Sequence, residues 1–439
     1  MLRSLILIPL LGLLFTPVDS NEPGRPVVKA ISHPGGEGAH LPNLALGADG
    51  RLYHTWVEPR EGGVTELLFS VMEEDGWSKP RPISRGSDWF VNWADFPAIA
   101  ALEDGTLLAH WLGRIDVGVY AYGVRMSLST DGGKTWGEPF SPHSDRSPTE
   151  HGFVSIVPRG EHFEVVWLDG REMTGGHGHG GGHGGELDGA EEPGAMAIRT
   201  ARVSRTGEVT GERVLDDRTC ECCQTAAVIL GEKLIVAFRD RSKSEVRDIS
   251  FVEVPPGGEA PHSRVLHADG WNQEGCPVNG PSLAIRSGDG PEARSELGAV
   301  WYTEAEGRPR VLFSRAKEDL SRFSPPSVLD GGNPVGRVDL APHPVSGWIA
   351  VWLERGDDSG EIRIRSIDAD GKPGDNLLVA RTSPERGAGF PRLEAVGERV
   401  IVTWTETRST EGGRAYPVGV RSAELEFPGE SPPAPGRQP

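Results

Sequence analysis

Four cysteines are the residues of this sequence best suited to chemistry, and three of them are almost adjacent. Cys220, Cys222 and Cys223 form a Cys-x-Cys-Cys segment, and Cys276 lies further along the chain. Thiolates bind borderline and soft metal ions such as zinc and copper. The spacing is not a standard zinc pattern, and an oxidising compartment would favour disulfides. Three interpretations stay open: disulfides between neighbouring structural units, a thiolate-rich metal site, and a redox-active pair.

Histidines form a second group of candidate metal ligands. His177, His179 and His183 lie in a Gly-rich stretch, whereas His40 and His151 occupy equivalent positions of the repeat described below. Histidine-rich tracts bind copper, nickel or zinc weakly, and a solvated insertion with incidental histidines is the alternative. The sequence therefore makes copper or zinc the expected cofactor, if the protein has one.

Four further residues are candidates for catalysis. Asp95 and Asp169 could act as general acid or base in the hydrolysis of a glycoside. Arg239 could bind a carboxylate through two parallel bonds, and Tyr302, close to Glu304, could act as a nucleophile. The alternative roles are structural: ion pairs between neighbouring units for the charged residues, and packing for the tyrosine.

A repeat runs the length of the chain and positions these side chains. Each copy has an apolar strand, a turn often built on Asp-Gly or Gly-Glu, and a second strand that ends in an aromatic residue. Those aromatic residues are Trp56, Trp111, Trp167, Phe238, Trp301, Trp352 and Trp404. A period of about 50 to 70 residues with short, Gly- and Pro-punctuated apolar runs is typical of four-stranded propeller blades. We expect an all-β fold, a seven-bladed β-propeller, with six blades as the alternative if one copy is irregular.

The two ends of the propeller are expected to meet. Residues 26–32 form an apolar strand with no partner in the first copy, and the last copy shows only three strands. The N-terminal strand is therefore expected to close the last blade, which removes an open sheet edge. The propeller should cover residues 24–427, followed by a disordered Pro-rich tail at 428–439.

Residues 1–20 have the pattern of a signal peptide. Arg3 supplies the positive start, an apolar core follows, and Ser20 ends a small-residue cleavage signal. The apolar core is too short for a good membrane span, so we expect an exported protein, periplasmic or extracellular, without membrane insertion. A net charge of −19 argues against nucleic acid as a partner. The oligomeric state is not indicated.

One segment carries a family resemblance. Residues 129–136 read STDGGKTW and match the pattern S-x-D-x-G-x-T-W known as the Asp-box, with degenerate copies at 74–77 and 319–323. The chain resembles the sialidase superfamily of BNR-repeat β-propellers, most closely exported bacterial sialidase-like proteins with CxCCQT and CPVNGP segments. The resemblance implies that the box is a structural hairpin, on the face opposite the active site.

The sequence departs from that family at one essential position. Sialidases carry an F/Y-R-I-P motif whose arginine begins a triad that grips the substrate carboxylate. Asp95 stands where this arginine is required, and its negative charge would oppose binding of the substrate. The resemblance would place the family's Tyr–Glu nucleophile at Tyr302 and Glu304, so sialidase activity is the second interpretation.

In a propeller, the starts of the inner strands and the loops between second and third strands open on one rim, where function generally lies. The aligned copies place His40, Asp95, His151 and Cys222 there, and Glu150 could orient the His151 ring. The leading interpretation is an exported propeller that binds a transition metal or another polar ligand at the channel mouth through His and Cys side chains. The alternatives are a glycoside hydrolase of the exo-sialidase kind, acting on extracellular glycans, and a non-catalytic interaction scaffold. The expected partners are accordingly a metal ion, a small molecule or a glycan.

Overall fold

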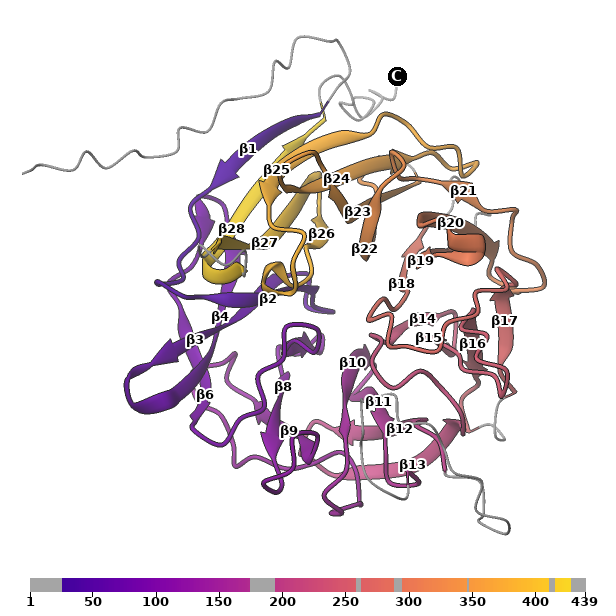
Figure 1. The fold of residues 1–439 in the computed structure, drawn as a ribbon. Coiled ribbons are helices and arrows are strands. Elements are labelled where there is room, and N and C mark those ends of the chain that lie inside the picture. Colours follow the sequence, from indigo (N-terminus) through magenta and orange to yellow (C-terminus); the bar gives the residue numbers. More distant parts are fainter. Residues whose placement is uncertain are drawn as a thin grey trace, which may run out of the picture.

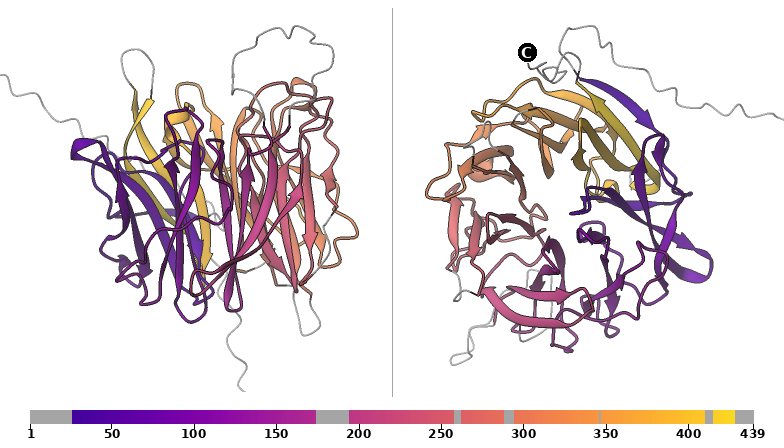
Figure 2. Two further views of the ribbon diagram at one scale, coloured as in Figure 1. Left: turned by 90° about the horizontal axis from the view of Figure 1, so that it is seen from below. Right: turned by 180° about the vertical axis from the view of Figure 1, so that it is seen from behind.

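Seven antiparallel sheets stand around a central channel (Figure 1). The computed structural model describes residues 26–173, 194–257, 262–287, 294–345, 347–409 and 415–427. Seen from below and from behind, the sheets stand side by side as the blades of a ring (Figure 2). The expected all-β propeller is confirmed, with seven blades rather than six. The expected signal peptide and Pro-rich tail lie outside the described residues.

The first strand of each blade lines the channel, and the others follow outward. Blade 1 contains β2 (His40–Leu46), β3 (Leu52–Arg60), β4 (Val64–Glu73), β5 (Gly76–Trp77) and β6 (Arg81–Gly86). Blade 2 contains β7 (Ala98–Ala101), β8 (Leu107–Arg114) and β9 (Tyr122–Ser129). Blade 3 contains β10 (His151–Arg159), β11 (His162–Asp169), β12 (Ala197–Ser204) and β13 (Val209–Asp216). Blade 4 contains β14 (Ala226–Leu230), β15 (Lys233–Arg239), β16 (Ile249–Val254) and β17 (Arg264–His267).

The remaining blades repeat this order. Blade 5 contains β18 (Ser282–Arg286), β19 (Glu296–Thr303), β20 (Arg310–Lys317) and β21 (Ser327–Val328). Blade 6 contains β22 (Pro334–Pro342), β23 (Trp348–Arg355), β24 (Gly360–Ile367) and β25 (Leu377–Thr382). Blade 7 contains β26 (Arg392–Val396), β27 (Arg399–Ser409), β28 (Ala415–Glu426) and β1 (Val27–Ile31). The described helical elements are short 3-10 turns at Glu61–Gly63, Ala305–Gly307 and Arg386–Ala388, and none of them could span a membrane.

The first and last strands of the chain close the ring. β1 lies beside β28 on the outer edge of blade 7 (Figure 1), and the two pair antiparallel from Val27 opposite Glu426 to Ile31 opposite Ser422. The N-terminal strand therefore completes the last blade, as the sequence predicts. This pairing satisfies backbone groups that would otherwise form an exposed edge.

The repeated aromatic residues pack between blades. Each of the seven interfaces between neighbouring blades has a hydrophobic cluster that contains one of these aromatic residues, and the interface between blades 7 and 1 has a second cluster around Leu44, Leu52 and Ile401. Trp56, Trp167, Trp301 and Trp352 have no exposed surface. A buried tryptophan removes about 200 Å² from water, which corresponds to about 5 kcal/mol of transfer free energy before entropic costs. The aromatic residues therefore repeat in the sequence once per blade because each of them fills one contact between neighbouring blades.

One strand register recurs in all seven blades. The residue immediately before each repeated aromatic pairs with one residue of the inner strand, and these inner-strand residues are Asn43, Ala98, Ser155, Ala226, Ser282, Asp339 and Arg392. All seven line the central cavity. We call this set the channel belt, because it places one side chain from each blade at the same level of the channel.

The segment at 129–136 is a tight turn after β9, the third strand of blade 2. Asp131 accepts bonds at Oδ1 from the backbone N–H groups of Lys134 (2.9 Å) and Thr135 (3.0 Å), and the Thr135 hydroxyl donates to Oδ2 (2.7 Å). Trp136 packs edge-on against Phe69 of blade 1. Strand alternation places this turn on the face opposite the starts of the inner strands, so its role is structural.

Deletion of β1 is expected to lower the melting temperature by several degrees and to promote association, because β28 then becomes an open edge. Differential scanning calorimetry and light scattering would measure both effects. Lys29→Gln is the matched control: it keeps the strand but removes the exposed Lys29–Glu426 ion pair, which contributes about 0–1 kcal/mol. An unchanged melting temperature without β1 would contradict this account of closure.

Candidate functional site

The four cysteines lie on one rim of the channel, in two adjacent blades. Inner strands all begin at this rim, because consecutive strands of a blade alternate in direction. Cys220, Cys222 and Cys223 immediately precede β14 of blade 4, and Cys276 lies in the segment that leads into β18 of blade 5. The repeat thus brings together thiols that are far apart in the sequence.

Three of these thiols form a compact group, which we call the thiol trio. The Sγ atom of Cys220 lies 3.3 Å from that of Cys223 and 3.8 Å from that of Cys222. All three sulfur atoms lie within 4.8 Å of one another, which is close enough to bind one metal ion. Cys276 lies outside the trio but its thiol interacts with that of Cys222. All four cysteines are free thiols, so the structure contains no disulfide among them, which was one of the three interpretations of the sequence.

The trio is buried and held from both sides. Cys220 and Cys223 are 1% and 2% exposed, whereas Cys222 is half-buried. The backbone N–H of Cys220 donates to the carbonyl of Arg239 (3.0 Å), which ties the segment to the end of β15. The backbone N–H of Asn279 donates to the Cys223 sulfur (3.4 Å), which ties it to blade 5. The sulfur atoms therefore occupy fixed positions before any ligand arrives.

A buried guanidinium favours the ionised form of one thiol. Burial alone would raise the pKa of Cys220, but bonds from Cys222 and Cys223 and the charge of Arg247 hold it well below its usual range. The pKa of Cys223 is raised, first by burial. Arg247 is 2% exposed and pairs with Glu221 (3.3 Å). Within the trio, the ionised form is therefore favoured at Cys220 and disfavoured at Cys223. Any thiol proton that is present must leave when a cation binds.

Arg239 links blades and is not available as a carboxylate ligand. Its Nε, Nη1 and Nη2 atoms donate to the carbonyl oxygens of Asn279 (2.7 Å), Arg247 (2.6 Å) and Tyr302 (2.6 Å). The guanidinium also lies over the Trp271 ring, 4.7 Å from its centroid, and the residue is 1% exposed. This predicted catalytic residue therefore stabilises the contact between blades 4 and 5.

Tyr302 has the partner that the sequence indicates but an unfavourable environment for a nucleophile. Its hydroxyl donates to Oε2 of Glu304 at 3.3 Å. Burial, and then the nearby Glu304 carboxylate, raise the pKa of the phenol. The phenolate that nucleophilic attack requires is therefore disfavoured.

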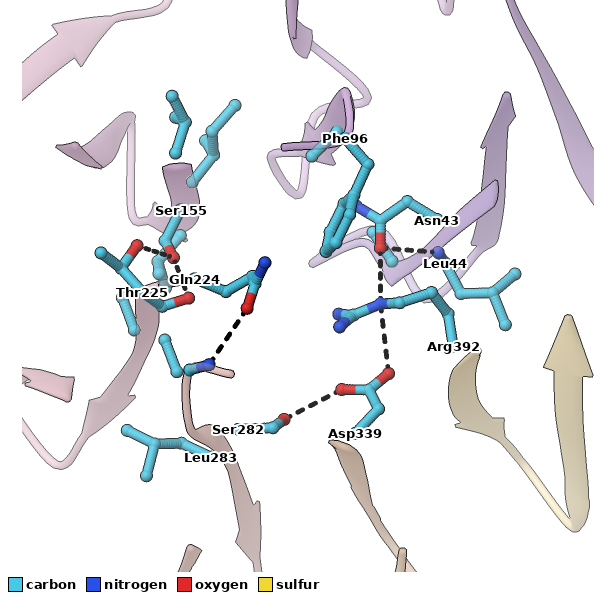
Figure 3. Close-up of a pocket in the computed structure, with 18 of the residues that line it drawn as sticks. Asn43, Leu44, Phe96, Ser155, Gln224, Thr225, Ser282, Leu283, Asp339 and Arg392 are labelled. Carbon is cyan, nitrogen blue, oxygen red and sulfur yellow. Dashed lines mark hydrogen bonds and ion pairs between the residues drawn. The ribbon is translucent and has the colours of Figure 1, made fainter. Parts of the chain in front are cut away.

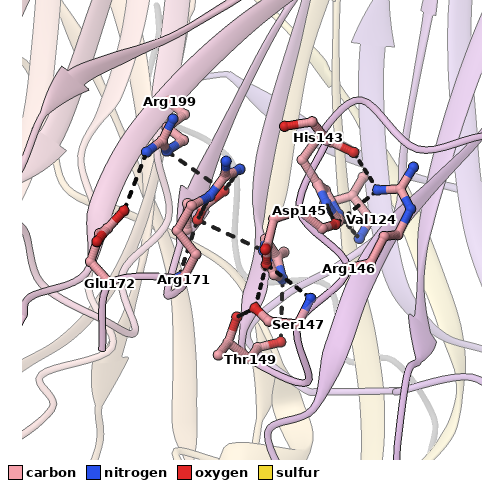
Figure 4. A network of polar contacts seen from close by, with 12 residues as sticks. Val124, His143, Asp145, Arg146, Ser147, Thr149, Arg171, Glu172 and Arg199 are labelled. Atoms are coloured by element: carbon pink, nitrogen blue, oxygen red, sulfur yellow. Dashed lines mark hydrogen bonds and ion pairs between the residues drawn. The ribbon is translucent and has the colours of Figure 1, made fainter. Parts of the chain in front are cut away.

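His151 and Asp169 belong to a polar network between blades 2 and 3. Figure 4 labels other members of this network, among them His143, Asp145 and Arg171. His151 is completely buried, stacks on His143 with ring centroids 4.1 Å apart, and places Nε2 3.0 Å from Oδ2 of Asp145. Burial lowers the pKa of His143 to about 4. Asp169 is bound by Arg171 through two 2.7 Å bonds. A carboxylate held in this way cannot readily accept or release a proton, so Asp169 is poorly placed for acid–base chemistry.

The structure does not bring the histidines together with the cysteines. Among the described residues, the metal-compatible group contains the three cysteines alone. His40 instead interacts through Nδ1 with the carbonyl of Gly38 (2.8 Å). Leu41 and Phe153, which follow the two histidines closely, have left-handed backbone angles (φ 54° and 53°), and strand pairing shifts at both points. This irregularity interrupts the alternation of side chains on which the expected shared site depends. His177, His179 and His183 lie outside the described residues.

Two buried carboxyl groups lie near the same rim. Asp95 is 4% exposed and accepts a bond at Oδ2 from the backbone N–H of Phe153 (2.7 Å), and burial raises its pKa to about 7. Burial raises the pKa of Glu150 to about 8, and its carboxyl group accepts a bond from the Tyr122 hydroxyl. Glu150 therefore pairs with a tyrosine and does not orient His151, contrary to the sequence-based expectation.

The channel itself contains a cavity of about 350 Å³ that sequence reasoning missed (Figure 3). Four channel-belt side chains from neighbouring blades are linked in a row by polar contacts. Arg392 donates a hydrogen bond to Asn43 (3.0 Å) and forms an ion pair with Asp339 (3.3 Å), and Asp339 accepts a hydrogen bond from Ser282 (2.9 Å). The Arg392 guanidinium points across the cavity toward Gln224. The sequence does contain a signal for this cavity. Polar residues recur at the channel-belt position of the inner strands, where a buried strand would ordinarily have an apolar residue.

The fold and the rim define the class: a seven-bladed β-propeller with a compact group of free thiols between two blades. No protein-family model and no curated protein matches the chain. A solved protein of unknown function from Dyadobacter fermentans is 14% identical, with 92% of this chain and 99% of that chain covered and a TM-score of 0.49. A subtype N11 neuraminidase-like protein of the flat-faced bat strain H18N11 is 9% identical, with 93% and 95% covered and a TM-score of 0.46.

The buried carboxyl of Asp95 predicts a pH-dependent difference in stability. Because its pKa is about 7 in the folded protein and near 3.8 when unfolded, the folded state keeps a proton that the unfolded state loses between these values. The wild type therefore loses stability as the pH rises through this window. Asp95→Asn keeps an acceptor for the Phe153 N–H and cannot ionise, so its melting temperature should rise relative to wild type from pH 5 to pH 8.

Thermal melts across that range would measure the effect. Asp95→Ala is the control, since it loses the bond from Phe153 and should be less stable than Asp95→Asn at every pH. A difference between Asp95→Asn and wild type that does not change with pH would contradict the assignment.

Proposed function

We propose that this protein is an exported β-propeller that binds a transition-metal ion, copper(I) or zinc, through cysteine thiolates at the rim of its channel. The observation that carries the proposal is the thiol trio, with all three sulfur atoms within 4.8 Å of one another. Free thiols at this separation, in a segment anchored to two blades, are what a thiolate metal site requires.

The arrangement of the ligands favours copper(I). Structural zinc is almost always bound by four ligands in a tetrahedron, whereas the trio offers three, and Cys276 would have to complete the set. Copper(I) is a soft ion that thiolates select. Three thiolates and one copper(I) carry a net charge of minus two, and Arg247 and Arg239 are the buried cations close to the sulfur atoms. These charges support a thiolate-rich site in a buried position.

Metal binding is tested with untagged protein, reduced without oxygen and supplied with copper(I) or zinc. We expect one equivalent of copper(I) to remain after gel filtration, measured by elemental analysis, and four free thiols in the denatured protein. Cys223→Ser should lose the bound copper, because it removes one of three ligands. His40→Gln is the matched control and should bind as wild type does, since His40 lies outside the trio. Substoichiometric copper and zinc in the wild type would refute the proposal.

The second candidate function is hydrolysis of an extracellular glycoside. The observation that favours it is Asp95, a carboxyl group that lines the channel cavity with a pKa of about 7, a value suited to general acid–base catalysis. Turnover of a panel of sialosides and neutral glycosides that Asp95→Asn abolishes would establish it. If neither metal binding nor turnover is found, the interaction scaffold is the function that remains.

A further inference from the structure

The four thiols differ sharply in their access to solvent. Cys220 and Cys223 are buried, Cys222 is half-buried, and Cys276 is exposed. The interaction between Cys276 and Cys222 joins the exposed thiol to the trio. The four thiols thus range from exposed at Cys276 to buried at Cys220 and Cys223.

Cys276 lies in a short arch that leads into blade 5. We use this name for residues 274–278, which are anchored at both ends. At one end, Nε of Arg247 donates to the carbonyl of Gln273 (3.1 Å). At the other end, the backbone N–H of Asn279 donates to the Cys223 sulfur (3.4 Å). The exposed thiol is thus fixed to the same structure that positions the buried thiols.

The far end of the arch has a strained backbone. Val278 has a left-handed φ of 49°, which is rare for a β-branched residue. The side chain of Asn279 holds this conformation: its Nδ2 donates to the carbonyl of Pro277 (3.2 Å), and its Oδ1 accepts from the backbone N–H of Arg337 (2.6 Å). Such strain persists only where surrounding bonds impose it, so the arch is built to hold Cys276 in one place.

We propose that Cys276 is the ligand through which a metal ion bound by the trio is exchanged with an external thiol, so that the protein passes its metal to, or receives it from, a thiol-bearing partner. The inference rests on the proposed metal binding. A ligand that served only to retain the ion would be buried with the others, whereas Cys276 is exposed and its thiol interacts with that of Cys222, the most accessible member of the trio.

The exchange is a ligand substitution that needs no oxidant or reductant. The Cys276 thiol passes its proton to Cys222 as the Cys276 sulfur bonds to the copper(I) ion and the bond from Cys222 breaks. An external thiol then passes its proton to Cys276 as its own thiolate replaces Cys276 on the ion. The remaining bonds to Cys220 and Cys223 break in the same way as further external thiolates bind, and copper stays monovalent throughout.

The experiment compares rates of exchange in the full-length mature protein loaded with copper(I) without oxygen. Reduced glutathione serves as the external thiol, and bathocuproine disulfonate traps and reports the copper that is released. Cys276→Ser should keep one equivalent of copper(I) but load and release it at least about tenfold more slowly, a barrier increase of about 1.4 kcal/mol in both directions. Glu274→Gln, an exposed substitution in the same arch, should exchange at the wild-type rate.

The outcomes separate this inference from the proposed function. Equal slowing of loading and release identifies Cys276 as a route, because loss of an ordinary ligand would mainly speed release. Unchanged rates in Cys276→Ser would overturn the inference, as would loss of the copper equivalent, which would make Cys276 a permanent ligand. A wild-type protein that binds no copper(I) would refute the metal site itself before any rate is measured.

Discussion

Packing between neighbouring blades is the constraint on which this molecule depends. A four-stranded sheet has two faces, and each face is buried only when another blade lies against it. The repeated aromatic residue within the second strand of every blade fills these interfaces, and four of the seven are tryptophans with no exposed surface. Because the contact is repeated around a ring, the loops at one rim come from every blade and still keep fixed relative positions.

The rim between blades 4 and 5 shows how that rigidity serves a site. Arg239 uses its guanidinium to bind three backbone carbonyls, two of them in the segments that carry the next blade. Its own carbonyl accepts the N–H of Cys220. One buried arginine thus fixes the thiol trio and the start of blade 5 with respect to each other.

Sequence reasoning predicts the parts of this structure that follow from periodicity. The seven repeated aromatic residues predict seven blades, and the unpaired N-terminal strand predicts that the chain ends pair to complete the last blade. The repeat also predicts that the cysteines of two blades lie on one rim. It could not place His40 and His151, because a left-handed residue follows each histidine closely and shifts the strand register locally. Nor could it show that Arg239 binds carbonyls or that Glu150 pairs with Tyr122, since such contacts depend on side-chain directions that spacing does not determine. The channel belt was visible in the sequence only as polar residues in otherwise apolar strands.

The closure of the ring has a consequence for how the protein is made. Lys29 of β1 and Glu426 of β28, which form an ion pair on the outer edge of blade 7, are 397 positions apart in the chain. During synthesis β1 therefore has no partner until β28 has been made, after the strands of the other six blades. Blade 7 can be completed only after that point, so its closure forms a contact of very long sequence separation, which is a slow kind of folding step.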